Sequence, residues 1–198
     1  MAEPIRFYFD FASPYAYFAA NEVELIARTH GRTVDWRPVL IWAVFKAQGI
    51  APPMELPAKR DYFVADMQRS AAFHGLDYSH PARLPVSTHR AARLYYTLAV
   101  QDVEAAPDFG RAIFAAYFTQ GLDISQEAVV VDVAGGLGIS EAAALRAING
   151  DFGRERLAEM IDIAVADKVC GSPWFIVDGE SFFGADRLPQ IAWRLGQA

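Results

Sequence analysis

The chain has 198 residues, of which 53% are hydrophobic, and 24 acidic against 18 basic residues give it a formal net charge of −6 at pH 7. This composition allows one large domain with a substantial core, and the lack of a basic run excludes the positive surface that nucleic acids require. Met1–Pro4 lack the basic and apolar pattern with which a signal peptide begins, and no apolar stretch is long enough to span a membrane. The single cysteine, Cys170, excludes an internal disulfide, and it and the histidines do not have the spacing of zinc ligands. We therefore expect a soluble, cytoplasmic protein that binds neither nucleic acid nor a metal ion.

The first forty residues predict a β-α-β unit. A short apolar run, Arg6–Asp10, indicates a strand, and Pro14 is typical of the first residue of a helix, which we expect to continue to about Arg28 before Gly31 ends it. In residues 33–39 apolar and polar side chains alternate, which indicates a second strand. Because the crossover is short, the two strands are expected to be parallel.

A long central region is predicted to be helical. It follows the proline-rich loop Gly49–Pro57 and contains segments with apolar residues at helical spacing, namely 59–74, 87–103, 107–118, 127–134, 140–148 and 152–167. Ser125 and Asp151 are expected to be N-caps of two of these helices. The run AVVVDVAGGLGIS, residues 128–140, imitates a strand that enters a dinucleotide-binding loop, but its third glycine is missing, so we expect a helix there.

After Gly171 the pattern changes from helical to β. The segment PWFIVDGESFFG contains two short β-rich runs joined by Asp178-Gly179, which favours a hairpin, and a final helix is expected over Asp186–Leu195. A parallel unit and a hairpin fit one four-stranded mixed sheet with the helical block inserted in its middle. The sequence therefore predicts an α/β protein with a thioredoxin-like fold, in which residues 1–48 and 169–198 form the thioredoxin-like domain and residues 49–168 form a large inserted α-helical subdomain.

Ser13 stands where thioredoxin-like proteins carry their first redox cysteine, at the joint between the first strand and the first helix. The N-terminus of that helix favours a thiolate. Pro173 stands where these folds place a cis-proline that faces the active site. Without the fold context, Ser13 would be interpreted as a helix N-cap and Pro173 as an ordinary trans proline. The context favours a functional site at both, while Cys170 is expected to be a small buried residue.

Four segments, FYFDFASPYAY, WRPVLIWAVFKAQG, PAKRDYFVADMQR and GSPWFIVDGESFFGADRL, resemble the 2-hydroxychromene-2-carboxylate isomerases. These enzymes of aromatic-hydrocarbon catabolism are relatives of kappa-class glutathione transferases and of DsbA. The resemblance extends over nearly the whole chain and implies a glutathione-dependent isomerase. It implies that Ser13 faces the glutathione sulfur and that Ser172, before the cis-proline Pro173, pairs its backbone with the cysteinyl unit. It further implies that Asp186 contacts the γ-glutamyl amine and that Lys46 contacts a carboxylate of the substrate or of glutathione.

Aromatic side chains in these segments suit the wall of a site for a small aromatic acid. The candidates are Tyr15, Trp42, Phe45 and Phe183, and each also suits the core. Asp186 is equally suitable as a helix cap, and Lys46 is equally suitable as a solvent-exposed residue.

Three positions depart from the family pattern. Ile50 and Ser87 stand where many members have asparagine, and Ala185 stands where a small polar residue is common, so a weaker affinity for glutathione or a different thiol or substrate is expected. Two other functions stay open: a kappa-like glutathione transferase or peroxidase, and a non-enzymatic thioredoxin-fold binding module. Because the resemblance is to proteins that are commonly dimers, a homodimer is expected.

Overall fold

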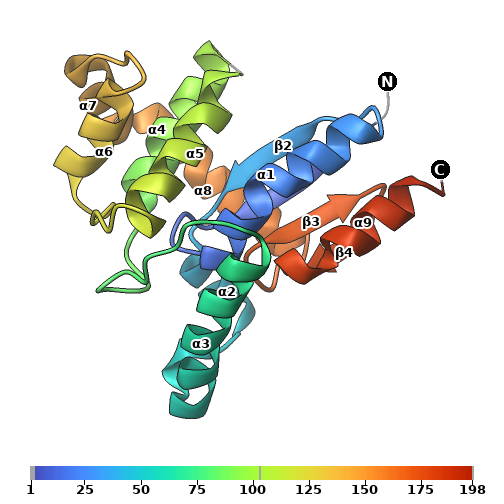
Figure 1. Ribbon diagram of the computed structural model, residues 1–198. Coiled ribbons are helices and arrows are strands. Elements are labelled where there is room, and N and C mark those ends of the chain that lie inside the picture. Colours follow the sequence, from blue (N-terminus) through green and yellow to red (C-terminus); the bar gives the residue numbers. More distant parts are fainter. Residues whose placement is uncertain (1–2, 103, 198) are drawn as a thin grey trace.

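One four-stranded mixed sheet forms the centre of the protein. The structure, a computed structural model, describes residues 3–102 and 104–197, and the strands lie in the order β2-β1-β3-β4 (Figure 1). β1 (Ile5–Phe9) pairs in parallel with β2 (Val34–Pro38) and antiparallel with β3 (Trp174–Val177), and β3 pairs antiparallel with β4 (Glu180–Phe183). The predicted β-α-β unit and hairpin are confirmed, and the two halves of the sheet come from opposite ends of the chain.

Helices from both ends of the chain cover the sheet, and the others form a block between the two halves. The helical elements from the two ends of the chain are α1 (Pro14–Thr29), α2 (Ile41–Gln48), a 3-10 turn η2 (Ala185–Arg187) and α9 (Leu188–Leu195). The block contains η1 (Pro53–Glu55), α3 (Pro57–Phe73), α4 (His89–Gln101), α5 (Ala105–Phe118), α6 (Glu127–Gly135), α7 (Glu141–Asn149) and α8 (Asp151–Ala166). In Figure 1, α4 to α7 gather at one end of the sheet, and α3 projects away from it at the bottom of the view. Dividing the chain into two units at residues 49 and 168 stays a prediction.

The two faces of the sheet differ in character because side chains alternate along each strand. On one face, Phe7 stacks on Phe175 with ring centroids 5.1 Å apart, and Trp36 lies beside Phe7 and donates a hydrogen bond to Glu24 on α1. On the other face, the Tyr8 hydroxyl donates to Asp167, which follows α8, at 2.5 Å. The apolar face therefore packs against α1, and a polar contact ties the opposite face to the end of α8.

Several predicted helix boundaries are wrong. Gln126, not Ser125, caps α6, because the Ser125 hydroxyl is already bonded to Asp123 in the preceding turn at 2.6 Å. Asp151 is the first residue of α8 rather than its cap. Gly150 takes the cap position, where a Cβ atom would lie 2.6 Å from the carbonyl oxygen of Arg146, so the tight joint between α7 and α8 requires glycine there.

Further differences concern the C-terminal helix, the fourth helix and the cysteine. Asp186 lies in the 3-10 turn η2, and α9 begins only at Leu188. α4 ends at Gln101, and Val103, the predicted end of that helix, lies outside the described residues. Cys170 is exposed rather than buried, because Val169 provides the buried apolar side chain at this point of the chain. In the part of the chain that the structure describes, no helix is both long enough and apolar enough for a membrane crossing.

Candidate active site

Ser13 is both the N-cap of α1 and a direct neighbour of the loop that precedes β3. Its hydroxyl oxygen accepts a hydrogen bond from the Ala16 amide at 3.3 Å and donates one to the carbonyl oxygen of Ser172 at 2.9 Å. The capping role that the sequence suggests is therefore confirmed. The second bond shows that the hydroxyl is also directed toward the Ser172 backbone.

The Ser172-Pro173 peptide bond is cis, as predicted. The Ser172 hydroxyl oxygen accepts from the Asp10 amide at 2.9 Å, and the Gly184 amide donates to the Pro173 carbonyl at 3.0 Å. These bonds connect the cis-proline loop to the end of β1 on one side and to the end of β4 on the other. Among the described residues, none accepts a hydrogen bond from the amides of Ser172 and Tyr15.

The end of β4 brings Phe183 and Asp186 near this loop. The ring of Phe183 lies against Gly171, where a Cβ atom would come within 2.0 Å of a ring carbon, so this close contact requires glycine. Asp186 follows Gly184, which is bonded to Pro173, and its carboxylate is exposed, with Arg187 at 3.4 Å. Phe183 and Asp186 thus lie on the segment that joins the cis-proline loop to α9.

The short helix α2 carries three predicted residues and is attached to both neighbouring segments. The Ile41 amide donates to the Asp10 carboxylate at 2.9 Å, and the Gln48 side-chain amide donates to the Val169 carbonyl at 2.6 Å. Three α2 side chains differ in exposure: Lys46 is exposed, Trp42 is 54% exposed, and Phe45 is only 8% exposed. Trp42 and Lys46 therefore have surface for a ligand, whereas Phe45 contributes mainly to packing.

Tyr15 connects the helix that begins at Ser13 to the projecting helix α3. Its hydroxyl donates to Asp66 at 2.6 Å, and its ring lies edge-on to Phe63. Burial, together with the bond to Asp66, raises the pKa of the Tyr15 hydroxyl. Burial acts to raise the pKa of Asp66 as well. Hydrogen bonds from Tyr15, Arg69 and Ser70 act in the opposite direction and outweigh burial, so the pKa of Asp66 is lowered overall. The polar end of Tyr15 is thus occupied within the protein.

Replacing Tyr15 with phenylalanine is expected to raise the pKa of Asp66 toward its ordinary value, because the carboxylate loses one of its donors. A carboxyl with a lowered folded-state pKa stabilises the protein above its unfolded pKa, and this contribution is lost as the pH falls through the folded value. In Tyr15→Phe, the free energy of unfolding should therefore fall less steeply as the pH is lowered than in the wild type. Carboxyl titration followed by NMR would measure the shift, and an unchanged Asp66 pKa would contradict the assigned contact.

Asp10 belongs to the site and is not among the predicted residues. It is 4% exposed, its carboxylate accepts hydrogen bonds from Ala12, Ile41 and Thr88, and its backbone bonds to Ser13 and Ser172. Burial raises the pKa of this carboxyl, and its three hydrogen bonds act in the opposite direction. The one signal in the sequence was an acidic residue at the end of an apolar strand.

The residues that depart from the family pattern occupy different surroundings. Ile50 is half-buried and its amide closes the C-terminal end of α2 by donating to Phe45. Ser87 is exposed and hydrogen-bonds His89, whereas Ala185 is buried. Cys170 is no replacement for a redox cysteine, because desolvation raises the pKa of its thiol and a reactive thiol needs a lowered one.

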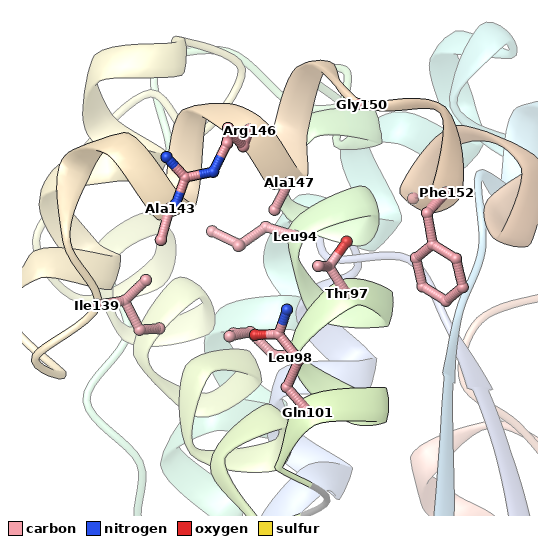
Figure 2. A pocket seen from close by; sticks show the side chains of 11 residues that line it. Leu94, Thr97, Leu98, Gln101, Ile139, Ala143, Arg146, Ala147, Gly150 and Phe152 are labelled. Atoms are coloured by element: carbon pink, nitrogen blue, oxygen red, sulfur yellow. The ribbon is translucent and has the colours of Figure 1, made fainter.

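A separate cavity of about 160 Å³ lies in the helical block, away from all predicted site residues. Figure 2 shows its lining from α4, from α7 and the residues around it, and from the start of α8, mostly apolar, with Arg146 as the one charged side chain. Its lining has no carboxylate, histidine, serine or cysteine, and its one hydroxyl, that of Thr97, donates to the Arg93 carbonyl, so no base is present to activate a nucleophile. In the described part of the chain, no three His, Cys, Asp or Glu side chains come together as a metal site. The candidate active site is therefore the region around Ser13.

Known proteins resemble this chain over nearly its whole length. The family model of DSBA-like thioredoxin domains matches residues 4–196. A 2-hydroxychromene-2-carboxylate isomerase of Pseudomonas putida is 28% identical over 195 residues, which cover 98% of this chain and 94% of the relative. Glutathione S-transferase kappa 1 of Caenorhabditis elegans is 28% identical over 205 residues, with 98% and 91% covered.

A solved structure gives the same result at the level of the fold. The structure of a 2-hydroxychromene-2-carboxylate isomerase superposes with a TM-score of 0.88 at 27% identity, covering 98% of this chain and 94% of that one. The fold around Ser13 and the match over nearly the full length both indicate the same family. The chain belongs to the family of DSBA-like thioredoxin domains, and within it is similar to 2-hydroxychromene-2-carboxylate isomerases and kappa-class glutathione transferases.

Proposed function

We propose that this protein is a glutathione-dependent isomerase that converts 2-hydroxychromene-2-carboxylate, or a close analogue, into trans-o-hydroxybenzylidenepyruvate. The observation that carries the proposal is Ser13, whose hydroxyl donates toward the cis-proline loop at the position of a redox cysteine. A hydroxyl has one hydrogen to donate, so that of Ser13 would turn from the Ser172 carbonyl to the thiolate when glutathione binds, and a hydroxyl cannot form a disulfide with the thiol. Bound glutathione would supply a thiolate that adds reversibly to the conjugated acid, permits rotation about the former double bond, and leaves unchanged.

The side chains and amides around Ser13 fit glutathione by their chemistry. The free amide of Ser172 and its carbonyl suit pairing with a peptide backbone, and the free amide of Tyr15 lies at the helix N-terminus, where an anion is stabilised. The exposed carboxylate of Asp186 suits the γ-glutamyl amine. We assign Lys46 to a carboxylate of the substrate or of glutathione, because it is an exposed cation on α2.

The energies support ionisation of a thiol at this position. A free thiol has a pKa of about 8.5, and lowering it by ~2 units requires ~2.7 kcal/mol of preferential stabilisation of the thiolate. A hydrogen bond to a charged partner contributes ~1.5–3 kcal/mol, and a helix N-terminus contributes ~0.3–1 kcal/mol. Together the two contributions amount to about 1.8–4 kcal/mol, a range that includes the stabilisation required, so the proposal needs no covalent bond to the protein.

Two exposed aromatic rings suit the wall for an aromatic substrate. Phe183 is 52% exposed beside the cis-proline loop, and Trp42 is exposed on α2. We assign both to the substrate, since such rings bind an aromatic acid by stacking. A substrate contact is less well supported for Phe45 and Tyr15, because Phe45 is buried and the Tyr15 hydroxyl is bonded to Asp66.

The purified protein is expected to change the absorbance of a hydroxychromene carboxylate rapidly when glutathione is added and only at the uncatalysed rate without it. Total thiol should stay constant during turnover, because the thiol is regenerated. Ophthalmic acid, which has no thiol, is the matched control and should not support turnover. Equal rates with and without glutathione would contradict the proposal.

A kappa-like glutathione transferase is the second candidate, and the similarity to Caenorhabditis elegans glutathione S-transferase kappa 1 favours it. In that case thiol would be consumed in proportion to product. A binding module without enzymatic activity would show no turnover at all, and failure to bind immobilised glutathione would exclude both enzymes. Reduction of insulin at the rate of a dithiol enzyme would contradict every one of these proposals, since they all rest on the loss of dithiol chemistry.

We also propose a cytoplasmic location and a homodimer. The cytoplasm keeps glutathione mostly in its thiol form, which the proposed reaction requires. Light scattering coupled to size-exclusion chromatography would give the oligomeric state. A mass near the 21.9 kDa of one chain would contradict the dimer.

A further inference from the structure

Asp10 is connected to four segments of the candidate site. Its carboxylate oxygen Oδ1 accepts from the Ala12 amide at 2.9 Å and from the Thr88 hydroxyl at 2.7 Å, and Oδ2 accepts from the Ile41 amide at 2.9 Å. Its own amide donates to Ser172, and its carbonyl accepts from Ser13, both at 2.9 Å. One buried residue thus contacts the Ser13 loop, the cis-proline loop, α2 and the start of α4.

The bond to Ile41 takes the place of a helix cap. The first amides of a helix have no acceptor within it, and Leu40, the residue before α2, offers no side-chain acceptor. Asp10, which lies 31 positions earlier in the chain, accepts from the first of these amides. A negative charge at this end of α2 is also favoured by the helix dipole. The position of α2, with Trp42 and Lys46, therefore depends on Asp10.

The bond to Thr88 connects the same carboxylate to the helical block. Thr88 stands directly before α4 and is 1% exposed, and in the described part of the chain Asp10 and Thr88 are the buried polar side chains. A buried polar group without a partner is costly, so these two groups stabilise one arrangement of the sheet relative to α4. Asparagine cannot replace Asp10, because its NH2 group would face either the Ile41 or the Ala12 amide.

We propose that Asp10 is a positioning residue, whose buried carboxylate holds α2 and the start of the helical block in place against Ser13. The role of α2 in binding the organic acid rests on the proposed function above. The attachment of α2 to Asp10 does not, because it is a property of the fold. The two parts are therefore tested by different measurements.

The kinetic test compares Asp10→Asn and Thr88→Val with the wild-type enzyme. We expect the KM for the hydroxychromene carboxylate to rise about tenfold or more in Asp10→Asn, the factor for an unpaired buried donor, and less in Thr88→Val. The kcat per folded enzyme should change by less than about threefold, and Thr88→Ser should retain the wild-type KM. Asp35→Asn on β2 and Thr97→Val on α4 are matched controls outside the site and should behave like the wild type.

A purely structural role gives a different result. Activity would then fall only with the amount of folded protein, at an unchanged KM, and the proposal would be overturned. If Asp10→Asn does not fold, the KM of Thr88→Val is compared with that of the wild type instead, since this variant removes one donor and keeps the carboxylate.

Amide hydrogen exchange tests the attachment of α2 without any substrate. In Asp10→Asn, the Ile41 amide should exchange at least about tenfold faster, while the amides of β1 keep their protection. Unchanged exchange at Ile41 would overturn the inference. If the wild type neither binds glutathione nor isomerises the substrate, the proposed function fails, and fast exchange at Ile41 would still establish Asp10 as the group that holds α2.

Discussion

Ser13→Ala is expected to lower turnover at neutral pH by roughly ten- to a hundredfold, the factor for ~1.5–3 kcal/mol of lost hydrogen bonding to a thiolate. Affinity for glutathione should change by only a few fold, because the contacts to the rest of the tripeptide remain. The pKa of the bound thiol should rise in the variant, so raising the pH should recover part of the lost rate. Turnover and thiolate absorbance, each measured against pH, would test this.

The control for Ser13→Ala is Ser140→Ala, which removes a similar N-cap far from the site. Ser140 accepts from the Ala143 amide at 3.3 Å, as Ser13 accepts from Ala16. Each variant should lose about 0.5–2 kcal/mol of stability from its helix cap, but only Ser13→Ala should lose activity. Undiminished turnover in Ser13→Ala would mean that the helix amides suffice. A covalent adduct on Ser13 in the wild type would mean that the serine is the nucleophile.

Phe114→Ala is expected to lower the free energy of unfolding by about 3–5 kcal/mol, the range for removing a fully buried phenylalanine ring. The Phe114 ring on α5 packs against Phe9 and Phe11, with centroids 5.5 and 5.4 Å away. It therefore joins the helical block to the apolar face of the sheet. Because domains are stable by only about 5–15 kcal/mol in total, this one change removes a large share of the stability.

Urea unfolding followed by circular dichroism would measure the loss in Phe114→Ala. Phe73→Ala is the control, because Phe73 is 85% exposed on α3 and its removal should change stability by less than about 0.5 kcal/mol. Similar losses in the two variants would contradict the assignment of Phe114 to the core. A loss below about 1 kcal/mol in Phe114→Ala would show that the aromatic cluster closes the space by repacking.

The parts of the fold that the sequence predicted correctly depend on neighbouring residues. The hairpin of β3 and β4 depends on Asp178-Gly179, where both residues have positive φ, and α1 depends on Ser13 and Pro14 at its start. Such signals lie within a few positions of the structure they form. The cis bond at Pro173 was predicted from the fold rather than from its neighbours, because no local signal distinguishes cis from trans there.

The parts that were missed or misplaced depend on residues far apart in the chain. The helix α2 was not predicted, because its first amide is capped by Asp10 rather than by a nearby side chain. Gln126 replaces Ser125 as the cap of α6, since Asp123 had already bonded the Ser125 hydroxyl. The exposure of Cys170 and the burial of Phe45 likewise follow from packing, which apolar character alone does not specify.

By itself, the sequence determined the order of the strands and of the α-helices other than α2, the mixed sheet, and the serine in place of a redox cysteine, because periodicity, turn residues and position along the chain carry this information. Only the tertiary structure decided that Ser13 donates to Ser172, that Tyr15 donates to Asp66, and that Asp10 accepts from Ile41. These contacts join residues between 31 and 159 positions apart. Their geometry is set by how the core packs, and no short segment of the sequence contains it.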